Sequence, residues 1–184
     1  RFRGAQRFLP LWLQPALGGL ICGLLGMSAY LLTARLAGTG SNTGFSIGYE
    51  SLDQAFEGQL IWQVLGVLLV LKFVAVVFNY ASGGSGGLFS PSLYLGGMLG
   101  GLVGIALDWF NGSVLALPGF PGTVEVIGGC VLLGMGACFA AVIRCPFTSL
   151  IIIIEMTGNY SLILPLMAGN ILSWGLATRF RPVS

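Results

Sequence analysis

Residues 73 to 107 carry no charged side chain, and this stretch most restricts the folds open to the chain. Within it, Ser82–Gly104 reads SGGSGGLFSPSLYLGGMLGGLVG, a glycine-serine turn that runs into a glycine-rich apolar segment. Pro91 follows closely behind the turn. Proline is tolerated in the first turn of a helix, because the amide hydrogens there have no intrahelical partner. The sequence therefore predicts a helix that begins near Gly87 or Leu88, at membrane depth.

The start of this helix is the candidate binding site. A helix that begins there leaves the backbone amides of Gly87, Leu88, Phe89 and Ser90 without an intrahelical acceptor. The positive end of the helix dipole adds to these donors, so the site favours an anion without any basic side chain. Because unpartnered amides are costly in a bilayer, we expect an anion or water to occupy this position.

The composition indicates a membrane protein. Hydrophobic residues make up 55% of the 184 residues and charged residues only 8%, whereas a soluble protein has about 25% charged residues. The net charge of +2 is too small for a basic surface, so no nucleic-acid partner is expected. We predict a multi-pass integral membrane protein of the plasma membrane or the inner cell membrane, in contact with lipid.

The apolar segments predict an all-α protein with several membrane-spanning helices and some broken or re-entrant ones. Leu60–Tyr80 has one charged residue, Lys72, which either snorkels to the membrane surface or faces the bundle interior. Phe147–Met156 is apolar but has only about ten residues, and a spanning helix needs roughly 20. Such discontinuous helices are typical of transporters and some channels. The other expected elements are spanning helices at Leu11–Leu36, Val124–Ile143 and Leu162–Thr178, a surface loop with a short helix at Tyr49–Gln59, and polar loops at Gly38–Gly48, Asn111–Gly122 and Thr157–Tyr160.

Glycines in the central helix are spaced for close packing. Gly96, Gly100 and Gly104 form one ridge of small residues, and Gly97 and Gly101 form a neighbouring one. Small residues at this spacing let two helices approach closely. We therefore expect this helix to pack inside the protein and not to face lipid.

An enzymatic function is not expected. Residues 83–87 match the G-x-S-x-G pattern of a nucleophile elbow around Ser85. That chemistry needs a base, but the sequence has no histidine, and Lys72 is its only lysine. The four cysteines form no C-x-x-C pair. Without histidine they are interpreted as packing residues, with no metal and no cofactor.

Two charged residues within apolar sequence have open roles. Glu155 lies near the end of an apolar run, where it could relay protons or bond to amides or a polar partner at a helix end. We favour the second role. Arg144 precedes Pro146, which breaks the helix. Arg144 could draw anions or pair with a carboxylate, and the sequence does not separate these two roles.

Two long motifs resemble the CLC family of chloride channels and chloride-proton antiporters. The run from Gly87 to Pro91, GLFSP, preceded by Ser82–Gly86, resembles the G-x-F-x-P anion-site motif of that family. Gly134–Ile171 resembles its late membrane region over its full length, and Gly48–Glu50 suits the family pattern before a short helix. The likeness covers nearly the whole chain.

The resemblance implies a fold of two inverted repeats, with a chloride path in each subunit of a homodimer. Residues 1–184 then correspond to most of the C-terminal repeat, so we expect a fragment of a longer polypeptide that lacks the N-terminal repeat. The resemblance implies that the amides of Leu88 and Phe89 bind chloride as the transported ligand. It also implies that Phe147–Thr178 supplies part of the dimer interface.

The resemblance leaves the transport mechanism open between a channel and a proton-coupled exchanger. The gating and proton-transfer glutamates that it implies belong to the repeat that is absent here. Two alternative hypotheses remain at this point, an unrelated secondary transporter with discontinuous helices and a non-transporting membrane scaffold.

Overall fold

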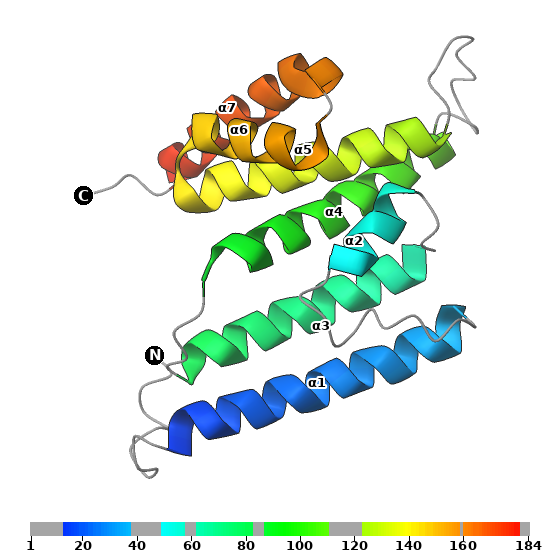
Figure 1. The fold of residues 1–184 in the computed structure, drawn as a ribbon, viewed down its shortest axis with the longest axis vertical. Coiled ribbons are helices and arrows are strands. Elements are labelled where there is room, and N and C mark those ends of the chain that lie inside the picture. The colour runs from blue at the N-terminus through cyan, green and yellow to red at the C-terminus, as the bar shows by residue number, and fades with distance from the viewer. Residues whose placement is uncertain are drawn as a thin grey trace.

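The computed structural model describes residues 13–37, 49–57, 62–82, 87–110, 123–158 and 160–180. Every regular element within these ranges is helical, which confirms the predicted all-α fold (Figure 1). The helices are α1 (Leu13–Ala37), α2 (Tyr49–Phe56), α3 (Trp62–Ala81), α4 (Phe89–Phe110), α5 (Thr123–Ile143), α6 (Pro146–Thr157) and α7 (Ile163–Phe180), with a short 3-10 helix at Tyr160–Leu162 before α7.

Four helices of the described chain are long and apolar enough to cross a membrane, namely Trp62–Ala81, Phe89–Phe110, Glu125–Ile143 and Tyr160–Phe180. The helix predicted at Leu11–Leu36 is present as α1, within which Gly18–Leu32 forms a shorter apolar stretch. Helix α6 has 12 residues and does not reach spanning length, as predicted. The predicted loops at Gly38–Gly48 and Asn111–Gly122 lie outside the described residues.

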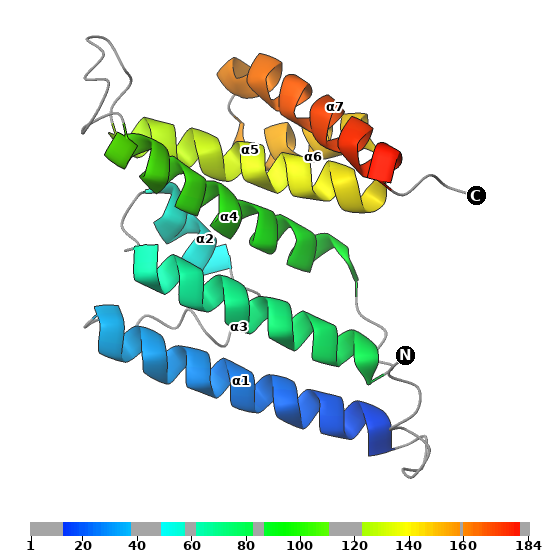
Figure 2. The same cartoon turned by 180° about the vertical axis from the view of Figure 1, so that it is seen from behind.

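The long helices α1, α3, α4 and α5 lie side by side in that order, and α6 and α7 pack on the far side of α5 (Figures 1 and 2). Helix α4 packs most extensively against α5 and also contacts α3. The short helix α2 was expected in a surface loop, and that expectation was only partly right. It packs against α4 and α5, and its Leu52 and Ala55 are buried.

The glycine ridge of α4 forms the contact with α5. A methyl group added at Gly104 would lie 3.0 Å from the Cα of Ile127, and one added at Gly100 would overlap the carbonyl oxygen of Cys130. Gly96 approaches Gly134 in the same way. The two backbones meet directly because no side chain separates them. The glycine face of α4 is therefore packed inside the protein, as predicted, but the rest of the helix is not, since Leu99 and Val103 are exposed.

The chain breaks between α5 and α6, as the proline predicts. Arg144 adopts a left-handed conformation with φ of 63°, and its amide still donates to the carbonyl of Ala140 at 2.9 Å. Pro146 then opens α6, where its missing N–H costs no intrahelical bond. The break turns α6 and α7 back along α5.

Polar side chains hold α6 and α7 on α5. The buried Ser149 hydroxyl donates to the carbonyl of Gly136 at 2.9 Å, and Ser173 donates to the carbonyl of Ala137 at 2.6 Å. The buried Asn170 amide donates to the carbonyl of Pro146 at 3.3 Å. In an apolar setting such interhelical hydrogen bonds fix how the helices are seated on one another.

Candidate anion site at the start of helix α4

The candidate site is formed by the backbone at the start of α4, just after the glycine-serine segment of the sequence. The helix begins at Phe89, one or two residues after the predicted start near Gly87 or Leu88. Its first hydrogen bond runs from the amide of Ser92 to the carbonyl of Leu88 at 3.2 Å. The amides of Leu88, Phe89 and Ser90 precede that bond, and Pro91 has no N–H. The helix start therefore presents donors that no helical carbonyl accepts.

Two of the described side chains at this helix start are engaged elsewhere than at its amides. The Ser92 hydroxyl turns back to the carbonyl of Phe89 at 2.8 Å and so does not cap the amides. The Phe89 ring packs edge-on against Phe139 of α5, with ring centroids 5.0 Å apart. Leu88 remains 52% exposed. Phe139 of α5 thus contacts the first residue of this helix, and Pro91 in its first turn lines a cavity between α1, α3 and α4.

Two further features of the helix start suit an anion. The first turn of α4 contains no acidic residue, so no fixed negative charge opposes the helix dipole there. A methyl group added at Gly87 would meet no atom within 4 Å, so there is open space beside this residue. Anion binding by Gly87, Leu88, Phe89 and Ser90 stays a prediction.

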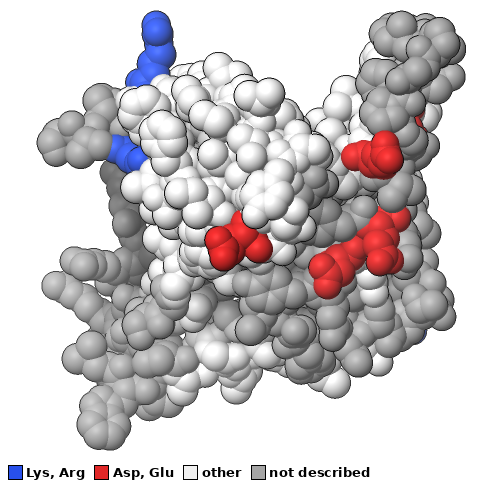
Figure 3. Space-filling model, turned by 45° about the horizontal axis from the view of Figure 1, so that its top comes forward, with Lys and Arg blue, Asp and Glu red and all other residues white. Residues whose placement is uncertain are grey.

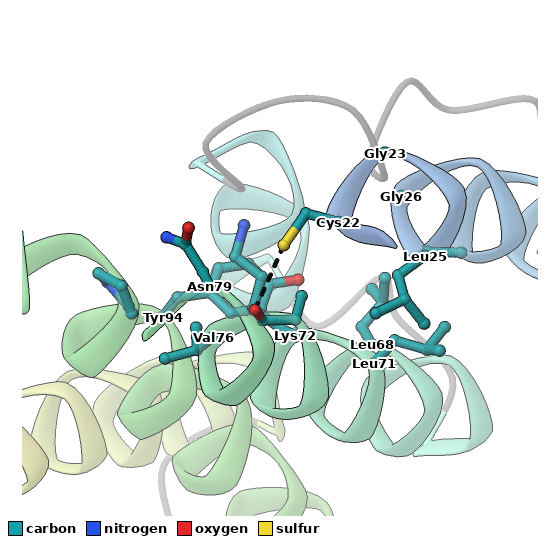
Figure 4. Close-up of a pocket in the computed structure, with 13 residues that line it drawn as sticks. Cys22, Gly23, Leu25, Gly26, Leu68, Leu71, Lys72, Val76, Asn79 and Tyr94 are labelled. Carbon is teal, nitrogen blue, oxygen red and sulfur yellow. Dashed lines mark hydrogen bonds between the residues drawn. The ribbon is translucent and has the colours of Figure 1, made fainter. Parts of the chain in front are cut away.

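Lys72 faces the interior of the bundle, which decides between the two positions that the sequence left open. Its Nζ lies 5.1 Å from the ring centroid of Tyr94, one turn beyond Pro91 on α4. Both Lys72 and Pro91 line a cavity of about 440 Å³ between α1, α3 and α4 (Figure 4). The sequence showed a lysine within an apolar segment but could not show which helices surround it.

Two other charged residues had open roles. Helices α4 and α5 are antiparallel, with Gly104 beside Ile127 and Gly96 beside Gly134, so the end of α5 that leads into Arg144 lies on the same side as the start of α4. Arg144 is half-buried at the junction of α5 and α6, and Glu155 is exposed in the last turn of α6. On the face shown in Figure 3, the basic side chains lie at the upper left, whereas the acidic side chains lie near the middle and on the right. Neither the proton-relay hypothesis for Glu155 nor its alternative is tested by this arrangement. The two roles considered for Arg144 also remain open.

The sequence also raised the questions of a metal site and of a serine nucleophile. No group of three or more His, Cys, Asp or Glu side chains within the described ranges could hold a metal ion. Ser85, the residue considered as a nucleophile, lies outside those ranges. The start of α4 and the cavity beside it are therefore the candidate sites of the described chain.

Comparison with known proteins decides the family. A family model described as "Voltage gated chloride channel" matches residues 1–178. The chain belongs to the CLC family. This confirms the resemblance and excludes an unrelated secondary transporter. Together with the four membrane-capable helices, it makes the chain an integral membrane protein.

Curated CLC relatives align with most of the chain. It is 32% identical over 151 residues to the H(+)/Cl(-) exchange transporter ClcA of Klebsiella pneumoniae subsp. pneumoniae, covering 82% of this chain and 28% of the relative. It is 35% identical over 169 residues to the putative chloride channel protein ClcB-like of Ralstonia nicotianae, covering 91% and 34%. The chain thus spans roughly 28–34% of the length of these relatives.

Sequence reasoning missed two features of this structure. One is the cavity beside α4, where Cys22 and Asn79 join Lys72. The other is the set of polar contacts among α5, α6 and α7. The sequence did indicate these polar contacts, because Asn170 is a polar residue in the middle of an apolar segment. Side chains of this kind usually form hydrogen bonds to another helix.

Proposed function

We propose that the chain is part of a protein that transports chloride or a similar anion across a membrane. In this proposal, backbone amides at the start of α4 hold the anion. The observation that carries the proposal is the first hydrogen bond of α4, from Ser92 to Leu88, because it leaves the preceding amides without helical acceptors. A hydrogen bond to a charged group contributes about 1.5–3 kcal/mol, so two such donors give substantial binding without a basic side chain.

The amides of Leu88 and Phe89 make the principal contacts, with Gly87 and Ser90 on either side of them. Helix α4 has 22 residues, and its dipole adds a partial positive charge at this end. Side chains shape the site only indirectly, since the hydroxyl of Ser92 is bonded to the carbonyl of Phe89. Binding therefore depends on the course of the backbone and on the N–H groups themselves.

The proposal concerns the full-length protein, of which this chain supplies the α4 site. The relatives carry the names of an exchange transporter and of a putative channel. Both names are compatible with an anion held on the main chain. The proposed function therefore stops at anion transport and does not choose between the two mechanisms.

A second copy of the chain is the proposed partner. The α6–α7 region, within Phe147–Thr178, exposes large apolar side chains, including Phe147 at 66%, Leu164 at 79% and Leu172 at 67%. An apolar surface of this kind is suited either to lipid or to a like surface. Following the resemblance, we assign part of it to the interface of a homodimer.

The test is a transport assay on the purified full-length protein in liposomes, combined with a calorimetric titration of chloride. Chloride efflux above that of empty vesicles, together with saturable chloride binding, is the expected result. A folded protein that neither binds nor moves chloride would instead support the non-transporting scaffold.

A further inference from the structure

The cavity beside α4 has the size and the wall of a small-molecule site. Its volume of about 440 Å³ lies within the range of roughly 300–1,000 Å³ typical of ligand pockets. It lies between α1 and α3 and extends to the first turns of α4, where Pro91 and Tyr94 contribute to its wall. Most of the remaining wall is aliphatic, with Leu25, Leu68 and Leu71 among the lining residues.

A few polar groups line this otherwise apolar space. Lys72 and Asn79 reach it from α3, and Cys22 reaches it from α1 (Figure 4). The Cys22 thiol donates to the carbonyl of Ala75 at 3.4 Å, whereas the Lys72 ammonium lies against the Tyr94 ring. Among the described residues that line the cavity there is no Asp or Glu. The wall therefore carries a positive charge, next to an amide that can also donate hydrogen bonds.

We infer that this cavity binds a single-chain amphiphile with a carboxylate head, of the size of a medium-chain fatty acid. The carboxylate accepts hydrogen bonds from the Lys72 ammonium and the Asn79 amide. The hydrocarbon chain packs against the leucines of α1 and α3. An ionisable residue within a membrane helix is a candidate for function, and here the charge of the cavity matches an anionic ligand.

The lipid phase supplies such a ligand directly. The outer surfaces of α1 and α3 next to the cavity are apolar, with Leu24 and Phe73 exposed. In this proposal, an amphiphile dissolved in the bilayer enters the cavity past these side chains. This site binds through side chains, whereas the adjoining site at the start of α4 binds through the main chain, so the inference does not rest on the proposed function.

The experiment measures equilibrium binding of radiolabelled decanoate to the full-length protein in nanodiscs, with empty nanodiscs subtracted. Saturable binding is expected, and unlabelled 1-decanol should compete more weakly than unlabelled decanoate. Lys72→Met should weaken decanoate binding by about ten- to a hundredfold, the loss of one hydrogen bond to a charged group. The affinity for decanol, measured by competition, should be nearly the same in Lys72→Met and in wild type. Lys72→Arg should retain most of the decanoate affinity.

A pair of glycines on α1 provides a matched test of the location. A methyl group added at either Gly23 or Gly19 would meet no atom within 4 Å, but only Gly23 lines the cavity. Gly23→Leu should therefore abolish decanoate binding, and Gly19→Leu should leave it unchanged. Chloride titration of the same samples shows whether chloride binding at the start of α4 has changed as well.

Three outcomes would overturn the inference. The first is decanoate binding that does not saturate. The second is equal decanoate affinity in wild type and Lys72→Met. The third is an equal effect of Gly23→Leu and Gly19→Leu on decanoate binding. The glycine pair decides the question if the lysine variant does not fold, since both glycine positions have room for a side chain.

Discussion

Replacing Phe89 with proline removes one backbone donor from the start of α4 while leaving the helix able to form. Phe89 is the first residue of α4, and proline is favoured at this position because the N–H there has no intrahelical acceptor. The preceding residue, Leu88, lies outside the helix, which suits a residue that precedes proline. The substitution therefore isolates one N–H without breaking a helical hydrogen bond.

The expected loss follows from that single hydrogen bond. A bond to a charged group contributes about 1.5–3 kcal/mol, and about 1.36 kcal/mol corresponds to a tenfold change in affinity. Phe89→Pro should therefore weaken binding of chloride or bromide by about ten- to a hundredfold. The assay is calorimetric titration of halide into the purified full-length protein, with circular dichroism to show that the fold is intact.

Two control variants separate the amide from its side chain. Phe89→Ala removes the edge-on contact with Phe139 but keeps the N–H, so it should bind halide far better than Phe89→Pro. Leu88→Val keeps its own amide and should bind nearly as wild type does. If Phe89→Pro and Phe89→Ala had equal halide affinity in folded proteins, the amide of Phe89 would not be a ligand.

Three further predictions concern packing and charge. Gly100→Ala should destabilise the protein by about 1–3 kcal/mol, because the new methyl group overlaps the carbonyl of Cys130. Gly129→Ala should not destabilise the protein, because a methyl group there meets nothing within 4 Å. Equal melting temperatures of the two variants would contradict the close α4–α5 packing. Ser149→Ala should cost about 0.5–1.5 kcal/mol by losing its bond to Gly136, whereas the exposed Thr178→Ala should melt as wild type does. Lys72→Met and Arg144→Gln should each leave equilibrium halide affinity within several-fold and affect only salt-dependent entry rates. Loss of halide binding in either folded variant would make that side chain a ligand.

The features that the sequence predicted well are those set by residues close together in the chain. The start of α4 was placed to within a residue or two because the glycine-serine sequence and Pro91 act locally. The break before α6 followed from Pro146 in the same way. The ridge of Gly96, Gly100 and Gly104 was visible from its spacing alone, although its partner helix was not.

The features that the sequence could not predict depend on contacts between distant segments. Lys72 had two possible positions until the packing of α1, α3 and α4 placed it in a cavity. The bond from Asn170 to the carbonyl of Pro146 joins residues 24 positions apart. The burial of Leu52 likewise needed α2 to lie against α4 and α5, which no local pattern indicates.

The central claim is that the anion lies on the main chain at the start of α4. It is tested most directly by anomalous diffraction from crystals of the full-length protein soaked in bromide. A bromide peak within hydrogen-bonding distance of the backbone nitrogens of Leu88 and Phe89 is the predicted result. Well-ordered density for this helix start without a bromide peak, in a crystal that binds bromide elsewhere along the transport path, would contradict the claim.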